Sequence, residues 1–320
     1  MIVEVSGLGV IGRRLHTELL ASNDVELVRL RTRRPDAVSA QLGGAPRTEV
    51  VGADEPVRAD WAALTVEAAA HRDALARYRS ARVPVVSCCD DAAVIDGLLG
   101  GVGTPVVVGA AFSPGLTDVM ASHTLTLLDE VDELHVARHG AAGSACVAAR
   151  ARAIRQPARD WRDGEWVERP PGSGRELCFF PEPVRGLDAY RANLSEVATL
   201  HAAHPGVARL SNRITMRRRE RLPAAVGLPA VPAPNNPASL GAAVVEARGR
   251  VGAGSESVLL GVVDRVDGAT AALMASCGNQ LVARGDQLTG TLTAGQVAPS
   301  VVMLAALAER GVSVARFGPQ

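Results

Sequence analysis

The chain has 320 residues, 47% of them hydrophobic, and its 34 basic and 34 acidic side chains give a formal net charge of zero. This length predicts a globular protein with two domains, or one domain with a large insertion. The balanced charge gives no electrostatic reason to expect a nucleic acid or an anionic membrane as a partner. Every basic residue other than histidine is an arginine, so a lysine Schiff base and a lysine acid or base are excluded.

The cysteines and the first residues indicate the compartment. Five cysteines occur, without the spacing of a metal site or of a disulfide framework. The chain starts on a predicted strand rather than a signal peptide, and no apolar run approaches the length of a membrane span. We therefore expect a soluble cytoplasmic protein without a metal, whose partners are a small molecule and a second copy of itself.

The first predicted strand, residues 2–6, leads into a glycine-rich turn and a predicted helix at residues 10–21. Glycines in such a turn allow a sharp bend, a close approach of a pyrophosphate to the backbone, and close packing of helix on strand. The phosphates would bind the free N–H groups at the start of the helix. We therefore predict a dinucleotide site, with a purely structural turn as the alternative. Its residues would be Gly7, Gly9, Val10, Ile11 and Gly12.

The end of the second predicted strand, residues 25–30, indicates which dinucleotide is bound. An acidic side chain here would accept hydrogen bonds from the adenosine ribose hydroxyls of NAD(H). The chain has Arg31, Thr32 and Arg33 instead, whose guanidinium and hydroxyl groups suit a 2′-phosphate. We predict NADP(H) as the cofactor, with NAD(H) second, and keep a solvent-exposed basic loop as the alternative.

The next elements continue the alternation of strand and helix, which is typical of an α/β fold with a doubly wound parallel sheet. Further helices are predicted at residues 70–82 and 91–99. The remaining strands of this sheet are predicted at residues 48–52, 62–66, 83–88 and 105–110.

After a predicted helix at residues 116–128 the pattern changes to apolar and polar alternation, which predicts an α+β domain on a largely antiparallel sheet. A proline-rich stretch at residues 227–237 predicts a loop. Strands are predicted at residues 131–138, 175–180, 207–215, 242–251 and 256–263, and helices at 269–283 and 298–310. We expect an NAD(P)-binding Rossmann domain at residues 1–115, a substrate and dimerisation domain at 116–290, and a C-terminal segment at 291–320 that packs back on the Rossmann domain.

Four stretches carry a family pattern: the glycine-rich turn, residues 83–91, residues 109–116 with Pro114 and Gly115, and residues 304–317. Together they resemble the saccharopine dehydrogenase (saccharopine reductase) superfamily, specifically its bacterial members of uncertain substrate, over most of the chain. The resemblance implies a Rossmann domain that binds NAD(P), an inserted substrate domain, a homodimer, and hydride transfer at a carbon–nitrogen bond. It provides no catalytic pair that could be transferred to positions of this chain.

Candidate catalytic residues follow from position, because ligands of an open α/β sheet bind at the carboxyl ends of its strands. Asp90 follows the fifth predicted strand and could hold an ammonium group or act as a general acid or base. The alternative is that Asp90 or Asp91 caps the following helix. The neighbouring thiols of Cys88 and Cys89 are expected to be small buried hydrophobes rather than nucleophiles.

Arg138 and His139 end the first strand of the second part, before a glycine-rich turn. Hydride transfer to an imine needs a proton donor, which His139 could be, and a cation for the substrate carboxylate, which Arg138 could be. A surface histidine in a loop is the alternative.

These observations predict an oxidoreductase that uses NADP(H) and acts on the carbon–nitrogen bond of a small amino or imino acid. Two alternatives stay open: a dehydrogenase of hydroxy or aldehyde substrates built on the same plan, and a nucleotide-binding sensor or scaffold without turnover.

Overall fold

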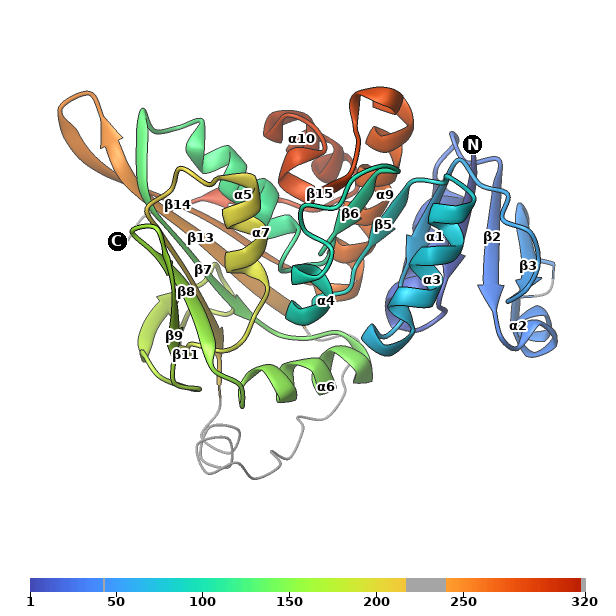
Figure 1. Cartoon of the computed structure of the whole chain (residues 1–320), viewed down its shortest axis with the longest axis horizontal. Coiled ribbons are helices and arrows are strands. Elements are labelled where there is room, and N and C mark those ends of the chain that lie inside the picture. The colour runs from blue at the N-terminus through green and yellow to red at the C-terminus, as the bar shows by residue number, and fades with distance from the viewer. Residues whose placement is uncertain (43, 217–239, 318–320) are drawn as a thin grey trace.

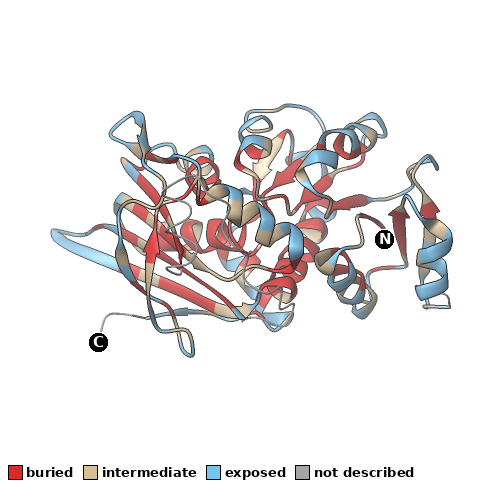
Figure 2. Cartoon of the chain, turned by 90° about the horizontal axis from the view of Figure 1, so that it is seen from below, coloured by how far each residue is buried: buried red, intermediate tan, exposed pale blue. Residues whose placement is uncertain are grey.

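The computed structural model describes residues 1–42, 44–216 and 240–317, so the predicted loop at residues 227–237 lies outside the described residues. Two sheets organise the fold, with helices between and around them (Figure 1). Buried residues concentrate in the strands of both sheets and in the helices between them (Figure 2). No helix in this part of the chain combines the length and the apolar character that crossing a bilayer requires.

The first sheet has seven strands, all parallel, in the order β15-β6-β5-β4-β1-β2-β3. Three of its inner strands, β4, β5 and β6, are short and almost entirely apolar, as expected for a parallel sheet covered on both faces. The prediction of a doubly wound α/β sheet is therefore confirmed. The strands are β1 (Ile2–Ser6), β2 (Leu27–Thr32), β3 (Thr48–Gly52), β4 (Trp61–Leu64), β5 (Val85–Ser87), β6 (Val106–Val108) and β15 (Thr291–Thr293).

Helices cover both faces of this sheet. Tyr78 of α3 packs on Leu64 on one face, while α1 packs on the other. The long helix α9 lies against α1, and its Gly278 approaches the ring of Trp61 so closely that a Cβ would lie 2.2 Å from it. Helix α9 thus packs against the first sheet and also contacts β14 of the second sheet. The helices are α1 (Val10–Ala21), α2 (Pro35–Leu42), α3 (Ala68–Ser80), α4 (Ala92–Asp96), α9 (Val266–Arg284) and α10 (Ser300–Glu309).

The second sheet is mixed and mostly antiparallel, in the order β10-β11-β12-β7-β13-β14-β16, with a β8–β9 hairpin joined to β12. Its parallel pair is β7 with β12. The prediction of a largely antiparallel second sheet is confirmed. The strands are β7 (Glu130–His139), β8 (Ala158–Arg162), β9 (Glu165–Arg169), β10 (Glu176–Phe179), β11 (Gly186–Tyr190), β12 (Arg209–Thr215), β13 (Leu240–Val251), β14 (Gly254–Arg265) and β16 (Val314–Arg316).

Three further helices accompany this sheet: α5 (Leu116–Leu125), α6 (Gly143–Ala153) and α7 (Glu196–Ala203). Both α5 and α7 cover one face, where Val119 and Leu200 share a buried core with Leu134 and Val136 of β7. The C-terminal segment is divided between the two sheets, because β15 pairs with β6 and β16 pairs with β14.

Candidate functional site

The glycine-rich turn joins β1 to α1, and its glycines have different roles. Gly7 has a φ of +100°, and a Cβ there would lie 2.7 Å from the carbonyl oxygen of Thr65. A Cβ on Gly12 would lie 2.0 Å from the carbonyl oxygen of Gly7, so helix and strand touch at this position. Both positions therefore require glycine for steric reasons.

Gly9 differs because a Cβ there would meet nothing within 4 Å. It is the N-cap of α1, and no side chain caps the helix. The first N–H groups of α1 and the positive end of its dipole are thus available to an anion. Val10 contacts the start of α6 at Gly143, and Ile11 lines a cavity described below. The turn therefore offers open space and free backbone N–H groups at the start of α1.

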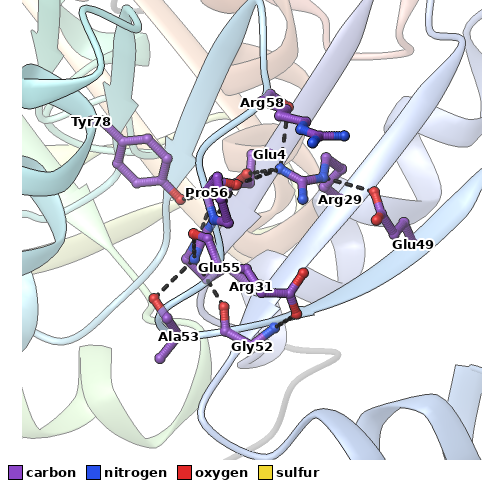
Figure 3. A network of polar contacts seen from close by, with 10 residues as sticks. All are labelled: Glu4, Arg29, Arg31, Glu49, Gly52, Ala53, Glu55, Pro56, Arg58 and Tyr78. Atoms are coloured by element: carbon purple, nitrogen blue, oxygen red, sulfur yellow. Dashed lines mark hydrogen bonds and ion pairs between the residues drawn. The ribbon is translucent and has the colours of Figure 1, made fainter.

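Arg31, predicted to bind a 2′-phosphate, has an internal role instead. Its side chain is 2% exposed, its Nε donates to Glu4 at 2.5 Å, and its Nη1 donates to the carbonyl oxygens of Gly52, Ala53 and Glu55 (Figure 3). The prediction fails because β2 extends through Thr32, two residues beyond the predicted strand end. Arg31 therefore lies within the strand and points to the face that carries Glu4.

Thr32 and Arg33 lie at the end of β2, before α2. The hydroxyl of Thr32 accepts a hydrogen bond from the backbone N–H of Arg34 at 3.1 Å, which fixes a tight turn. Arg33 and Arg34 are exposed, and the described part of the chain provides no carboxylate partner for either guanidinium. The exposed guanidinium groups of Arg33 and Arg34 provide the positive charge on which the predicted phosphate contact depends.

A cavity of about 50 Å³ lies at the carboxyl ends of the parallel strands, between the two sheets. Ile11 of α1, Asp90 after β5 and Ser113 after β6 line it from the first sheet. Arg138 and the turn after β7 line it from the second. Thr270 of α9 also lines it, and its buried hydroxyl has no hydrogen-bond partner among the described residues. The cavity thus combines the nucleotide turn with polar groups from both sheets.

Asp90 and Arg138, two predicted catalytic residues, form an ion pair at this cavity. Nη1 of Arg138 lies 3.4 Å from Oδ2 of Asp90 and also donates to the carbonyl oxygen of Ser113. The open question about capping is settled by Asp91, whose carboxylate accepts from the first N–H groups of α4. Asp90 is therefore left to pair with Arg138.

A second carboxylate, on Glu196 of α7, also meets Arg138. Its Oε1 lies 3.3 Å from Nε of Arg138 and accepts a hydrogen bond from the hydroxyl of Ser113 at 2.7 Å. Glu196 is fully buried, and this guanidinium is the cation that its carboxylate meets among the described residues. The sequence analysis did not identify Glu196. A signal was present, since it is the acidic residue within an otherwise weakly polar stretch, Leu194 to Leu200.

Asp118 on α5 lies further inside. It is fully buried, and its Oδ1 accepts a hydrogen bond from the hydroxyl of Thr199 at 2.8 Å. Burial, and secondarily the charge of Glu196, raise the pKa of Asp118 to about 8. This carboxyl therefore carries a proton at neutral pH.

His139 follows Arg138 directly but points to the opposite face of β7. Its Nδ1 lies 2.8 Å from the hydroxyl of Thr215, and its ring lies 6.3 Å from that of Phe180. Successive side chains of a strand alternate between its faces, so the side chains of Arg138 and His139 leave β7 on opposite sides. His139 nevertheless lines the cavity at the end of the strand.

The thiols near the cavity are protonated. Burial raises the pKa of Cys89 and of Cys146 to about 12, and it raises that of Cys88 well above the usual range. A protonated thiol is a poor nucleophile. The cysteines are therefore packing residues at this edge.

The chain was compared with family models, curated proteins and solved structures, and the solved structures include similar folds. No family model and no curated protein matches the chain. Its structure is similar to apo saccharopine dehydrogenase (L-Glu forming) from Saccharomyces cerevisiae, with a TM-score of 0.67 and 11% identity over 99% of this chain and 100% of that chain. It is also similar to C. glutamicum DAP dehydrogenase in complex with DAP, with a TM-score of 0.55 and 15% identity over 94% and 95% of the two chains.

A third similar structure is an engineered D-amino acid dehydrogenase bound to NADP+, with a TM-score of 0.53 and 16% identity over 94% of this chain and 95% of that chain. Identities this low establish the fold. The chain has a saccharopine dehydrogenase-like fold, as the sequence resemblance predicted.

Proposed function

We propose that the protein is an NADP(H)-dependent oxidoreductase that acts on the carbon–nitrogen bond of a small amino or imino acid. The observation that carries the proposal is the cavity between the uncapped start of α1 and the Asp90–Arg138 pair. A nucleotide on the turn would direct its reactive end toward groups that suit an amino acid. The names of the similar structures, which are amino acid dehydrogenases, support the same class.

The cofactor would be held by the backbone of the glycine-rich turn, with Val10 and Ile11 beside it. Thr32 and Arg33 would contact the 2′-phosphate that distinguishes NADP(H) from NAD(H). The unpartnered hydroxyl of Thr270 fits a polar ligand in the cavity. When bound, the nicotinamide would supply or accept the hydride.

The substrate would use the two charges of the ion pair. The Asp90 carboxylate suits an ammonium group, and the Arg138 guanidinium suits a carboxylate. An α-amino acid carries both groups, so it could exchange one internal ion pair for two external ones. His139, held by Thr215, is the proposed proton donor at the edge of the cavity.

Titration with NADPH and with NADH, followed by nicotinamide fluorescence, tests the cofactor assignment. The wild type is expected to bind NADPH more tightly. Arg33→Ala should weaken NADPH binding about tenfold and leave NADH binding unchanged, because one charge-assisted hydrogen bond is lost. Failure of both nucleotides to bind would overturn the proposal.

A second candidate is a nucleotide-binding protein without turnover. It is favoured by the state of the cavity, where Arg138 is already neutralised by Asp90 and Glu196 and the thiols are protonated. The two candidates differ in one measurement. Mixing bound NADPH with a panel of 2-oxo acids and ammonium should oxidise the nucleotide in an enzyme and leave it reduced in a binding protein.

A further inference from the structure

A second cavity, of about 190 Å³, lies on the other face of the second sheet. Glu133 and His135 of β7 line it, whereas Leu134 and Val136, which alternate with them, pack into the core under α5 and α7. Because strand side chains alternate between faces, this cavity is separated from Arg138 by the sheet itself. It is distinct from the candidate active site.

The lining of this cavity is charged and carries an excess of cations. Five arginines and three carboxylates line it, so positive charges exceed negative charges by two. Four of the arginines have carboxylate partners. For the fifth, Arg162 at the end of β8, residues 1–42, 44–216 and 240–317 provide no carboxylate partner. Arg162 is exposed and available to an anion.

Asp160 offers a negatively charged acceptor in the same cavity. Its side chain is 2% exposed, and its Oδ2 accepts hydrogen bonds from Nε of Arg191 at 2.9 Å and from Nε of Arg169 at 3.4 Å. Its Oδ1 is buried and has no hydrogen-bond partner among the described residues. A buried carboxylate oxygen without a donor is costly, and a ligand with an N–H group would remove that cost.

Asp160 and Arg162 are two residues apart on β8, so their side chains leave the strand on the same side. Both line the cavity, whose volume exceeds that of several water molecules at roughly 30 Å³ each. We propose that this cavity binds a small zwitterion of the amino-acid class, with its ammonium group on Asp160 and a carboxylate on Arg162. The site is independent of the proposed oxidoreductase chemistry.

Isothermal titration of the wild-type protein with L-aspartate and with succinate tests the proposal. The two probes share their carboxylates and differ in the ammonium group. We expect L-aspartate to bind about tenfold more tightly, because only L-aspartate can donate to Asp160. In Asp160→Asn this difference should disappear. Arg162→Gln should weaken both probes several-fold and leave their ratio unchanged.

Arg159→Gln is the matched control, because Arg159 lies on the same strand but does not line the cavity and pairs with Asp96. It should bind both probes as the wild type does. Binding of NADPH should be unchanged in all three variants, which separates failure of this site from failure of the proposed function.

Equal affinity for the two probes, or no binding of either, would overturn the proposal. So would wild-type binding of L-aspartate by Arg162→Gln, which keeps the test decisive should Asp160→Asn fail to fold. Sedimentation velocity measures whether the substitutions change the dissociation of the expected homodimer. The wild type could fail to bind L-aspartate while the dimer dissociates more readily in Asp160→Asn and in Arg162→Gln. That result would assign the cavity to contact with a second copy of the chain and would also overturn the proposal.

Discussion

Arg138 and Asp90 meet across the boundary between the two sheets, with Nη1 of Arg138 3.4 Å from Oδ2 of Asp90. One lies on β7 of the second sheet and the other follows β5 of the first. Glu196 on α7 approaches the same guanidinium, so three segments of the chain meet at one cation.

Arg138→Met should therefore lower the free energy of unfolding by about 3–5 kcal/mol, because Glu196 would be left as an uncompensated buried charge. Urea denaturation measures this change. The double variant Arg138→Met with Glu196→Gln should recover most of the loss. A single variant as stable as the wild type would show that the ion pair does not support the boundary.

The glycine-rich turn allows a matched pair of substitutions. Gly9→Asp should abolish NADPH binding by placing a negative charge at the phosphate site, and leave the fold intact, because space is open there and aspartate is a good N-cap. Gly12→Ala should destabilise the protein instead, because its Cβ would lie 2.0 Å from the carbonyl oxygen of Gly7. Thermal unfolding and nucleotide titration of both variants separate the two effects. Unaltered NADPH binding by Gly9→Asp would contradict the assignment of the turn.

The buried carboxyl of Asp118 predicts a pH dependence of stability. Its pKa is raised from 3.8 to about 8 in the folded chain, so between these values the folded state holds a proton that the unfolded state has lost. The contribution of this group is greatest below about pH 4 and falls as pH rises toward 8, by at most ~1.4 kcal/mol per pH unit. Asp118→Asn removes this titration and keeps an acceptor for Thr199.

The measurement is the difference in unfolding free energy between the wild type and Asp118→Asn, from urea denaturation at pH 5, 6, 7 and 8. The wild type should lose stability relative to the variant across this series. A constant difference would show that Asp118 titrates alike in both states.

The network around Glu4 predicts that the stability lost on removing a carboxylate depends on how deeply that carboxylate is buried (Figure 3). Glu4 is fully buried and accepts from Arg29, Arg31 and Tyr78, so Glu4→Gln should cost about 3–5 kcal/mol of unfolding free energy. Glu49→Gln is the control, because Glu49 meets the same Arg29 but is 47% exposed, and should cost about 0–1 kcal/mol. Equal effects in chemical denaturation would contradict the role of burial.

The sequence determined the local features of this protein. The glycine-rich turn, the alternation of strand and helix up to residue 112 and the change of period after residue 128 follow from neighbours in the chain, so the two sheets could be predicted. Short elements with weak periodicity, such as α2 and α7, were missed, and Glu196 was missed with α7.

The tertiary structure decided where side chains point and which of them meet. A shift of two residues in the end of β2 turned Arg31 from a cofactor ligand into the partner of Glu4. Arg138 and His139 are adjacent in sequence, yet strand alternation sends them to opposite faces. Asp90 and Asp91 are also adjacent, yet Asp90 meets Arg138 of the second sheet, whereas Asp91 caps α4 and lies 3.6 Å from Nη2 of Arg152. The direction of a side chain depends on the exact register of its strand and on distant segments, and local sequence specifies neither.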